Sequence, residues 1–320
     1  MLTRIVAFSP TSYPTFTSLW NEAYPELKRT EFEMRLFDMS LPHQTSGRRW
    51  LAEHDGQLVG FSGYEPVEGD SPSEGKLQLH LYVTKAHRTK GIGSRLYEKV
   101  TAALTDGRDV RAWVRQDRAE SLHFMAARGF VEQMRTFHSA LEVAAFDLSS
   151  LEKYLRRLQK YEYRFRTFVD LATEPERNRK IYELYCTVLR DIPSPDPRQI
   201  MSFADYEKRI SMSPELFGAY FIALHRDEYV GLCVLFPQGR ATRELYADTM
   251  GVRREYRGRG IAQALSHCGI QYARRRGYST IWADSFVENH RINVLLESLG
   301  FGARTEWTLF SKGRTSLKKL

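Results

Sequence analysis

Two short segments of this 320-residue chain combine glycines with basic side chains in a way that suits phosphate binding. The first reads RTKGIG from Arg88 to Gly93, and the second reads RGRGIA from Arg257 to Ala262. Glycine lets the backbone approach a ligand closely, and successive N–H groups at the start of a helix attract an anion. Flanking basic side chains add charge for further phosphates. The candidate cofactor-binding residues are Arg88, Lys90, Gly91 and Gly93, and in the second segment Arg257, Gly258, Arg259, Gly260, Ile261 and Ala262.

Each segment lies between a predicted strand and a predicted helix. The strands cover Lys76–Val83 and Glu244–Val252. Apolar residues then recur at helical spacing, at Ile92, Leu96 and Val100 in the first copy and at Ile261, Leu265 and Cys268 in the second. A tight turn without a ligand explains one such junction, but two in matching surroundings favour binding.

These junctions belong to an internal duplication. Three landmarks recur in the same order, namely Gly60 and Gly231, Val83 and Val252, and Phe130 and Phe301, which are 171, 169 and 171 positions apart. The two glycines each lie in a predicted hairpin, and the two phenylalanines each follow a glycine. Landmarks at a nearly constant spacing indicate a repeated unit.

The duplication predicts two domains, 1–146 and 161–320, joined by a helical segment, 147–160. This segment has Asp147 or Ser149 as a possible N-cap and apolar residues at Leu151, Leu155 and Leu158. It contains no proline or glycine, so we expect an ordered helix rather than a flexible linker. A further strand is predicted near the N-terminus, at Arg4–Phe8.

The strand of the second copy carries groups that could accept a proton. Because side chains alternate along a strand, Glu244, Tyr246, Asp248 and Met250 are predicted to share one face. The matching positions of the first copy are Gly75, Leu77, Leu79 and Leu81. We therefore expect the second half to be catalytic, with Asp248 or Glu244 as the base. The alternative is that both carboxylates lie in solvent or in ion pairs. His80, on the opposite face of the first strand, is the rival candidate.

The motif R-x-x-G-x-G/A between a strand and a helix, followed later by G-F, resembles the pyrophosphate-binding region of the GNAT superfamily of N-acetyltransferases. The resemblance covers nearly the whole chain, and residues 182–197 resemble the second half of tandem members of the mycothiol synthase type. It implies an α/β fold of two tandem domains, each a mixed, mostly antiparallel sheet flanked by helices. It also implies acetyl-CoA as the cofactor.

The resemblance assigns further roles. A backbone N–H near the end of the motif strand, around Met250–Val252 or Tyr82–Val83, would donate to the oxyanion, so Met250, Val252 and Val83 join the cofactor-binding candidates. Asn289 would bind the pantetheine region of the cofactor, and it could also cap a helix.

The chain differs from the family at the position of the proton donor. Phe124 and Leu295 stand where the family often has a tyrosine. Tyr246 or water is the remaining candidate for the donor, unless the thiolate, with a pKa of about 8.5, leaves unaided.

We expect an N-acyltransferase that moves an acetyl group from acetyl-CoA to a primary amine of a small molecule, by direct attack in a ternary complex. The loop 191–197 and Tyr24-Pro25 are expected to lie beside the acceptor clefts. The alternatives are a lysine or N-terminal protein acetyltransferase and a catalytically weak acyl-CoA-binding regulatory module.

Composition limits the other classes. The net charge is +8 and the pI is near 9.3, which suits a phosphorylated partner. Nucleic acid is not expected, because the basic residues 253–259 belong to the second loop and those at 274–276 end a helix. The three scattered cysteines predict no metal site and a reducing, cytoplasmic location. No apolar run is long enough to cross a membrane. A tandem pair can pack as a pseudo-dimer, so we expect a monomer.

Overall fold

The computed structural model describes residues 3–40, 48–67, 75–104, 107–194, 200–212, 219–238 and 242–313. These residues form two compact units. The first unit contains the described residues up to Gln133 together with those from Thr308 onward, and the second contains Met134–Trp307.

The first unit is a sheet with helices on both faces. Its elements are β1 (Thr3–Ala7), α1 (Tyr13–Ala23), α2 (Glu31–Ser40), β2 (Arg49–His54), β3 (Gln57–Pro66), β4 (Leu77–Val83), α3 (Ile92–Ala102), β5 (Val110–Arg115) and α4 (Ala119–Ala126). The strand order is β1-β2-β3-β4-β5-β12, where β12 (Gly302–Lys312) is the last strand of the chain. One core, with Phe16, Trp20 and Met34, packs α1 and α2 on one face, and another, with Ile92 and Leu96, packs α3 on the other.

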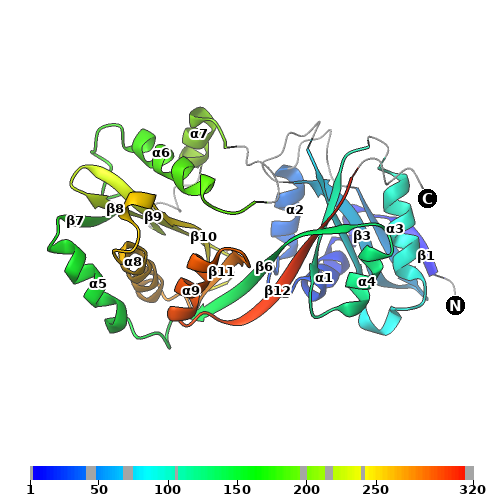
Figure 1. Cartoon of the computed structure of the whole chain (residues 1–320). Coiled ribbons are helices and arrows are strands. Elements are labelled where there is room, and N and C mark those ends of the chain that lie inside the picture. Colours follow the sequence, from blue (N-terminus) through cyan, green and yellow to red (C-terminus); the bar gives the residue numbers. More distant parts are fainter. Residues whose placement is uncertain are drawn as a thin grey trace. The chain divides into compact units, whose positions relative to one another are not determined.

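The second unit repeats this plan (Figure 1). Its elements are β6 (Val131–Glu142), α5 (Ser149–Gln159), β7 (Tyr163–Thr167), α6 (Arg177–Arg190), α7 (Phe203–Met212), β8 (Tyr220–His225), β9 (Glu228–Pro237), β10 (Glu244–Val252), α8 (Ile261–Arg275), β11 (Thr280–Phe286) and α9 (His290–Ser298). The strand order is β12-β6-β11-β10-β9-β8-β7. The pairs β4–β5 and β10–β11 are parallel, and the other pairs with a described register are antiparallel. The predicted mixed, mostly antiparallel fold is confirmed.

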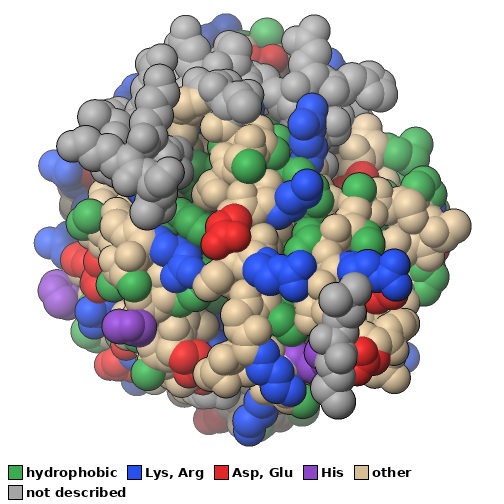
Figure 2. Space-filling model, turned by 90° about the vertical axis from the view of Figure 1, so that its right-hand side faces the viewer, with side chains coloured by type: hydrophobic (Ala, Val, Ile, Leu, Met, Phe, Trp, Pro, Cys, Tyr) green, Lys and Arg blue, Asp and Glu red, His purple; other side chains and the backbone are tan. Residues whose placement is uncertain are grey.

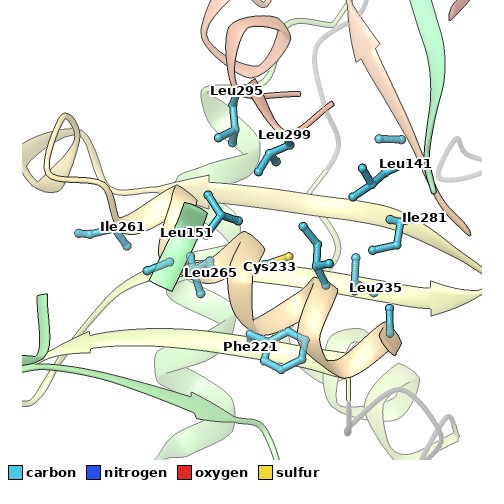
Figure 3. Close-up of a cluster of buried hydrophobic side chains, with 14 of the residues drawn as sticks. Leu141, Leu151, Phe221, Cys233, Leu235, Ile261, Leu265, Ile281, Leu295 and Leu299 are labelled. Carbon is cyan, nitrogen blue, oxygen red and sulfur yellow. The ribbon is translucent and has the colours of Figure 1, made fainter. Parts of the chain in front are cut away.

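The helix predicted between the repeats is α5, and it packs into the core of the second unit. Its N-cap residue is Leu148 rather than Asp147 or Ser149, and Asp147 accepts a hydrogen bond from the Ser149 backbone N–H at 3.0 Å. Leu151 lies in the same hydrophobic cluster as Ile261 and Leu265 of α8 and Leu235 of β9 (Figure 3). The opposite face of the sheet packs on α6 and α7 through a second cluster that includes Ile181 and Tyr220.

The compact units do not coincide with the sequence repeats. Strand β6 begins in the first unit, and from Met134 it belongs to the second. Strand β12 makes the reverse crossing, and from Thr308 it belongs to the first. The predicted boundaries 1–146, 147–160 and 161–320 follow the duplication of the sequence, whereas the compact units follow the paths of these two strands.

Strand β10 contains a bulge that strand β4 lacks. Ala247 pairs with Leu235 and Thr249 with Val234, so Asp248 is the additional residue. Pairing between β3 and β4 is uninterrupted from Gly60↔Val83 to Pro66↔Leu77. An inserted residue reverses the alternation beyond it. The expectation that Met250 shares a face with Glu244 and Tyr246 is therefore wrong. Met250 packs with the α8 cluster, on the other side of the sheet.

Candidate active site

The two predicted phosphate loops have the same backbone conformation. Gly91 and Gly260 have φ of 75° and 89°, and each is the N-cap of the helix that follows. Two residues earlier, Thr89 and Gly258 also have positive φ, of 60° and 75°. Neither N-cap makes a side-chain capping hydrogen bond, so the first N–H groups of α3 and α8 have no side-chain acceptor at the cap. This backbone suits a phosphate.

The first arginine of each motif braces the loop instead of pointing away from it. Nε of Arg88 donates to the Val83 carbonyl at 3.1 Å, and Nε of Arg257 donates to the Val252 carbonyl at 2.8 Å. Arg259 donates to the Tyr163 hydroxyl at 3.0 Å. These three side chains hold the loop conformation, which leaves the backbone N–H groups and exposed residues such as Lys90 to face a ligand.

The two loops differ in their surroundings. A Cβ atom at Gly91 would meet no heavy atom of the described structure within 4 Å, whereas one at Gly260 would lie 2.6 Å from the Tyr154 ring of α5. Arg157, one turn further along α5, donates to the Arg259 carbonyl at 2.6 Å. The second loop is therefore fixed by α5, and the first has no equivalent helix among the elements described.

An acidic residue at the end of α6 also contacts the second loop. Asp191 pairs with Arg254 at 2.5 Å and with Arg257. Hydrogen bonds from Arg254 and then from Arg257 hold the pKa of Asp191 below its usual value. The position of residues 191–197 beside the acceptor cleft stays a prediction; Asp191 itself contacts the second loop, and 195–197 lie outside the described residues.

The motif strand and its parallel neighbour part in both units. The register of β4 with β5 consists of Leu77↔Val110 and Gln78↔Arg111. That of β10 with β11 ends at Ala247↔Ala283. Beyond these positions the two strands of each parallel pair separate and leave a fork between them. The backbone groups of β4 and β10 that face this fork are available to another hydrogen-bonding partner. The fork opens toward the phosphate loop, so an extended ligand with a phosphate at one end fits both features.

The two candidate bases, Asp248 and Glu244, lie at different distances from this fork. Asp248 is the bulged residue, is exposed, and follows the last paired residue of β10 directly. Its carboxylate accepts a hydrogen bond from the Thr249 hydroxyl at 2.7 Å. Glu244 begins the strand, four residues and roughly 13 Å further from the fork. The structure thus brings Asp248 to the fork and leaves Glu244 away from it.

Tyr246 is part of a hydrogen-bonded group that the sequence did not reveal. Its hydroxyl donates to one carboxylate oxygen of Asp284 at 2.8 Å, and His138 Nδ1 lies 2.5 Å from the other. His138 stacks on Trp282, with centroids 4.7 Å apart. Burial, followed by the charge of Asp284 and its hydrogen bond, raises the pKa of Tyr246 well above its usual value. Tyr246 is therefore neutral at neutral pH, and its hydroxyl proton is directed at Asp284.

The remaining predicted residues have clear positions. Asn289 is the N-cap residue of α9 without making a side-chain cap. Phe124, in α4, stacks under the guanidinium of Arg128, and Leu295 is buried in the second core. His80 is hydrogen-bonded on both ring nitrogens, by Tyr24 and Glu65.

Comparison with known proteins identifies the class. The model of the acetyltransferase (GNAT) family matches residues 13–130 and 178–301. The chain therefore belongs to this family, with one copy of the domain in each repeat, and it is an N-acetyltransferase.

Individual relatives match this chain over most of its length. A mycothiol acetyltransferase of Nocardia farcinica (strain IFM 10152) is 24% identical over 277 residues, which cover 82% of each chain. A GCN5-related N-acetyltransferase from Sphaerobacter thermophilus has a TM-score of 0.72, with 18% identity over 98% of this chain and 96% of that one. A tandem GNAT protein from the clavulanic acid biosynthesis pathway has a TM-score of 0.71, with 16% identity over 98% and 99% of the two chains.

Three further observations bear on other classes of function. No described helix is long and apolar enough to cross a membrane. The described residues contain no group of three or more His, Cys, Asp and Glu side chains arranged to hold a metal. On the face shown in Figure 2, Lys and Arg side chains are interspersed with acidic, hydrophobic and uncharged ones, and the described part of that face has no continuous basic surface.

Proposed function

We propose that this protein transfers an acetyl group from acetyl-CoA to a primary amine of a small molecule, by direct attack in a ternary complex formed in the second unit. The observation that carries this proposal is the exposed Asp248 on the β10 bulge, at the point where β10 leaves β11. Family membership and relatives named mycothiol acetyltransferase support the reaction class.

The second loop and the fork would hold the cofactor. Backbone N–H groups from Gly258 to Ala262 suit the pyrophosphate, and the unpaired edge of β10 and Asn289 suit the pantetheine arm. Acetyl-CoA supplies a thioester whose carbonyl becomes an oxyanion on attack. A backbone N–H between Met250 and Val252 is suited to donate to that oxygen.

Asp248 would remove the proton of the attacking amine. A lysine-like ammonium has a pKa of about 10.4, so a nearby carboxylate or a water bound to it is needed at neutral pH. Tyr246 is bonded to Asp284 and would orient that carboxylate rather than accept a proton itself. Glu244 is assigned no direct role, because of its distance from the fork.

The polar side chains around Asp248 favour a small polar substrate. Tyr206 and Tyr220 lie with their hydroxyl oxygens 3.4 Å apart and are both buried. Burial, followed by the neighbouring Tyr206, raises the pKa of Tyr220, so its hydroxyl stays neutral. Tyr246 and Asp284 place an exposed hydroxyl and carboxylate beside Asp248, since Ala247 pairs with Ala283.

The test is thiol release from acetyl-CoA in the presence of a panel of small primary amines. The Asp248→Asn variant should lower kcat about 10²- to 10⁴-fold, the range for a lost general base. Asp227→Asn, on an exposed turn, is the matched control and should leave kcat unchanged. Wild-type kcat in Asp248→Asn would refute the assignment of the base. Absence of acetyl-CoA binding by calorimetry would refute the reaction itself.

Cofactor binding by the second loop has its own test. Gly258→Glu places a negative charge in open space, since no heavy atom lies within 4 Å of its Cβ position. It should weaken acetyl-CoA binding at this site at least tenfold. Gly277→Glu is the control, because Gly277 has nearly the same φ, 74° against 75°, and the same open surroundings away from the loop.

A further inference from the structure

We infer that the first unit holds a second acyl-acceptor site, specific for amines that also carry a carboxylate. Tyr24 receives the proton of the amine and is backed by His80 and Glu65, while Arg29 binds the carboxylate. The inference rests on the proposed function in one respect, that acetyl-CoA is the donor.

The first observation is a buried chain of hydrogen bonds. The Tyr24 hydroxyl lies 2.8 Å from Nδ1 of His80, and Nε2 of His80 lies 3.2 Å from Oε1 of Glu65. Burial opposes ionisation of Glu65, but the charge and hydrogen bond of His80 and the charges of Arg49 and Arg29 outweigh it, so the pKa of Glu65 lies below its usual value. An ionised carboxylate only accepts hydrogen bonds, so Nε2 carries a hydrogen, and in the neutral imidazole Nδ1 then accepts from Tyr24.

This chain ends at the fork of the first unit. Gln78 is the last residue of β4 in register with β5, and His80 follows two residues later on the same face. The positive charge of Arg118 acts against the burial that raises the pKa of Tyr24, and it does the same at Tyr82. Arg118 is the N-cap residue of α4, the position that Asn289 holds before α9. Because the Tyr24 hydroxyl lies 2.8 Å from His80 Nδ1, it also lies close to this fork, which opens toward the first loop.

The second observation is a buried guanidinium with a spare donor. Nη1 of Arg29 is buried and has no hydrogen-bond partner among the described residues. The group lies over the rings of Trp20 and Phe37, at 5.3 and 4.4 Å from their centroids. Burial lowers the pKa of Arg29. Trp20 also contacts His80, with centroids 5.0 Å apart, so the cation and the hydrogen-bonded chain both pack against the Trp20 ring.

The loop that carries Arg29 is held in place. The Asn21 side chain accepts from the Arg29 N–H at 2.8 Å and donates to its carbonyl at 2.9 Å. Glu26 pairs with Arg115 at the end of β5, at 2.6 Å. An ordered, desolvated guanidinium binds a carboxylate without the cost of first being immobilised.

The proton released by the amine passes through Tyr24 and His80 and ends on the leaving thiolate. As the amine nitrogen bonds to the acetyl carbon, its proton passes to the Tyr24 oxygen, and the Tyr24 proton passes to Nδ1 of His80. The carbon–sulfur bond then breaks, and coenzyme A leaves as a thiolate. The imidazolium, paired with Glu65, returns the proton through Tyr24 to the thiolate.

The experiment uses the full chain in the Asp248→Asn background. The probes are glycine, β-alanine and γ-aminobutyrate, which differ in the distance between amine and carboxylate, each compared with its methyl ester. We expect turnover of at least one free acid, with a lower KM than for its ester. Adding Tyr24→Phe or His80→Gln should lower kcat about 100-fold with KM unchanged. Adding Arg29→Gln should raise KM for the acid 10- to 100-fold and leave that for the ester unchanged.

Two outcomes would overturn the inference. One is loss of all turnover of these acids in Asp248→Asn, with wild-type kcat in Tyr24→Phe on its own. The other is no turnover of any of the three acids by a wild-type protein that binds acetyl-CoA. Tyr24→Phe keeps the ring that packs on Trp20, so a folding defect is not expected, and the unfolding midpoint checks it. Failure of the proposed function gives a different result, because the protein would then also fail to acetylate amines that lack a carboxylate.

Discussion

At the scale of single residues, the equivalent glycines Gly91 and Gly260 are subject to different structural constraints. Both Gly91 and Gly260 have a positive φ, which costs other residues about 1–2 kcal/mol. At Gly260, but not at Gly91, an added Cβ atom would also overlap with the Tyr154 ring. A large substitution there would disturb packing as well as ligand binding, which is why Gly258 is the better probe of the second loop.

We predict that Gly260→Ala lowers the free energy of unfolding by about 3 kcal/mol, and Gly91→Ala by about 1 kcal/mol. The difference is the overlap of the new methyl group with the Tyr154 ring. Urea denaturation measures both values. Combining Gly260→Ala with Tyr154→Ala should cost less than the sum of the two single changes, and strict additivity would show that Tyr154 does not restrict this position.

At the scale of elements, periodic patterns predicted most of the fold. The strand Glu244–Val252 agrees with the structure at both ends, and the predicted helices after both loops are α3 and α8. The bulge at Asp248 could not be predicted, because one extra residue leaves the apolar pattern almost intact. Its effect was an error in the face assigned to Met250. The role of α5 was also missed, since its sequence predicts a helix but not the surface on which it packs.

Contacts between distant strands could not be predicted either. His138 and Asp284 are 146 positions apart and meet because β6 pairs with β11. Nothing in a single sequence indicates that a strand of the first repeat lies in the sheet of the second unit. The contacts of His80 with Tyr24 and Glu65 could not be predicted either, because the three residues come from separate elements.

The end of α6 and the second loop should be linked by a pH-dependent interaction. The folded pKa of Asp191 is lowered, so its contribution to stability is present above its unfolded pKa of about 3.9 and is lost as the pH falls through the folded value. We predict that the wild type loses about 1 kcal/mol more stability than Asp191→Asn between pH 6 and pH 3. Urea midpoints at several pH values measure this. Equal losses in the two proteins would mean that the pairs with Arg254 and Arg257 add no stability.

At the scale of the whole molecule, each unit is completed by a strand whose path begins in the other repeat. Phe310 is buried in the core of the first unit, where its neighbours include Ile92 and Val110. Thr308 and Leu309 are also buried. The first unit therefore depends on residues from the far end of the sequence, and a fragment cut at residue 146 lacks part of its own core.

We predict that Phe310→Ala destabilises the first unit by about 3 kcal/mol, the usual cost of removing a buried phenylalanine ring. Hydrogen exchange should show faster opening of β2, β3 and β4, which are distant in sequence. Ser311→Ala, on the neighbouring position, is the control. An effect confined to residues near position 310 would contradict the view that β12 completes this core.

This dependence sets an order of events during protein synthesis. The second unit is one continuous stretch, Met134–Trp307, and needs no residue made after its own last one. The first unit waits, after Gln133, for 174 further residues before Thr308 is added. At a rate of about 10 residues per second, that interval is roughly 17 seconds. During this time β5 has an open edge, which is where a nascent chain is most exposed to mispairing or in need of a chaperone. The half that the ribosome begins first is thus the half that is finished last.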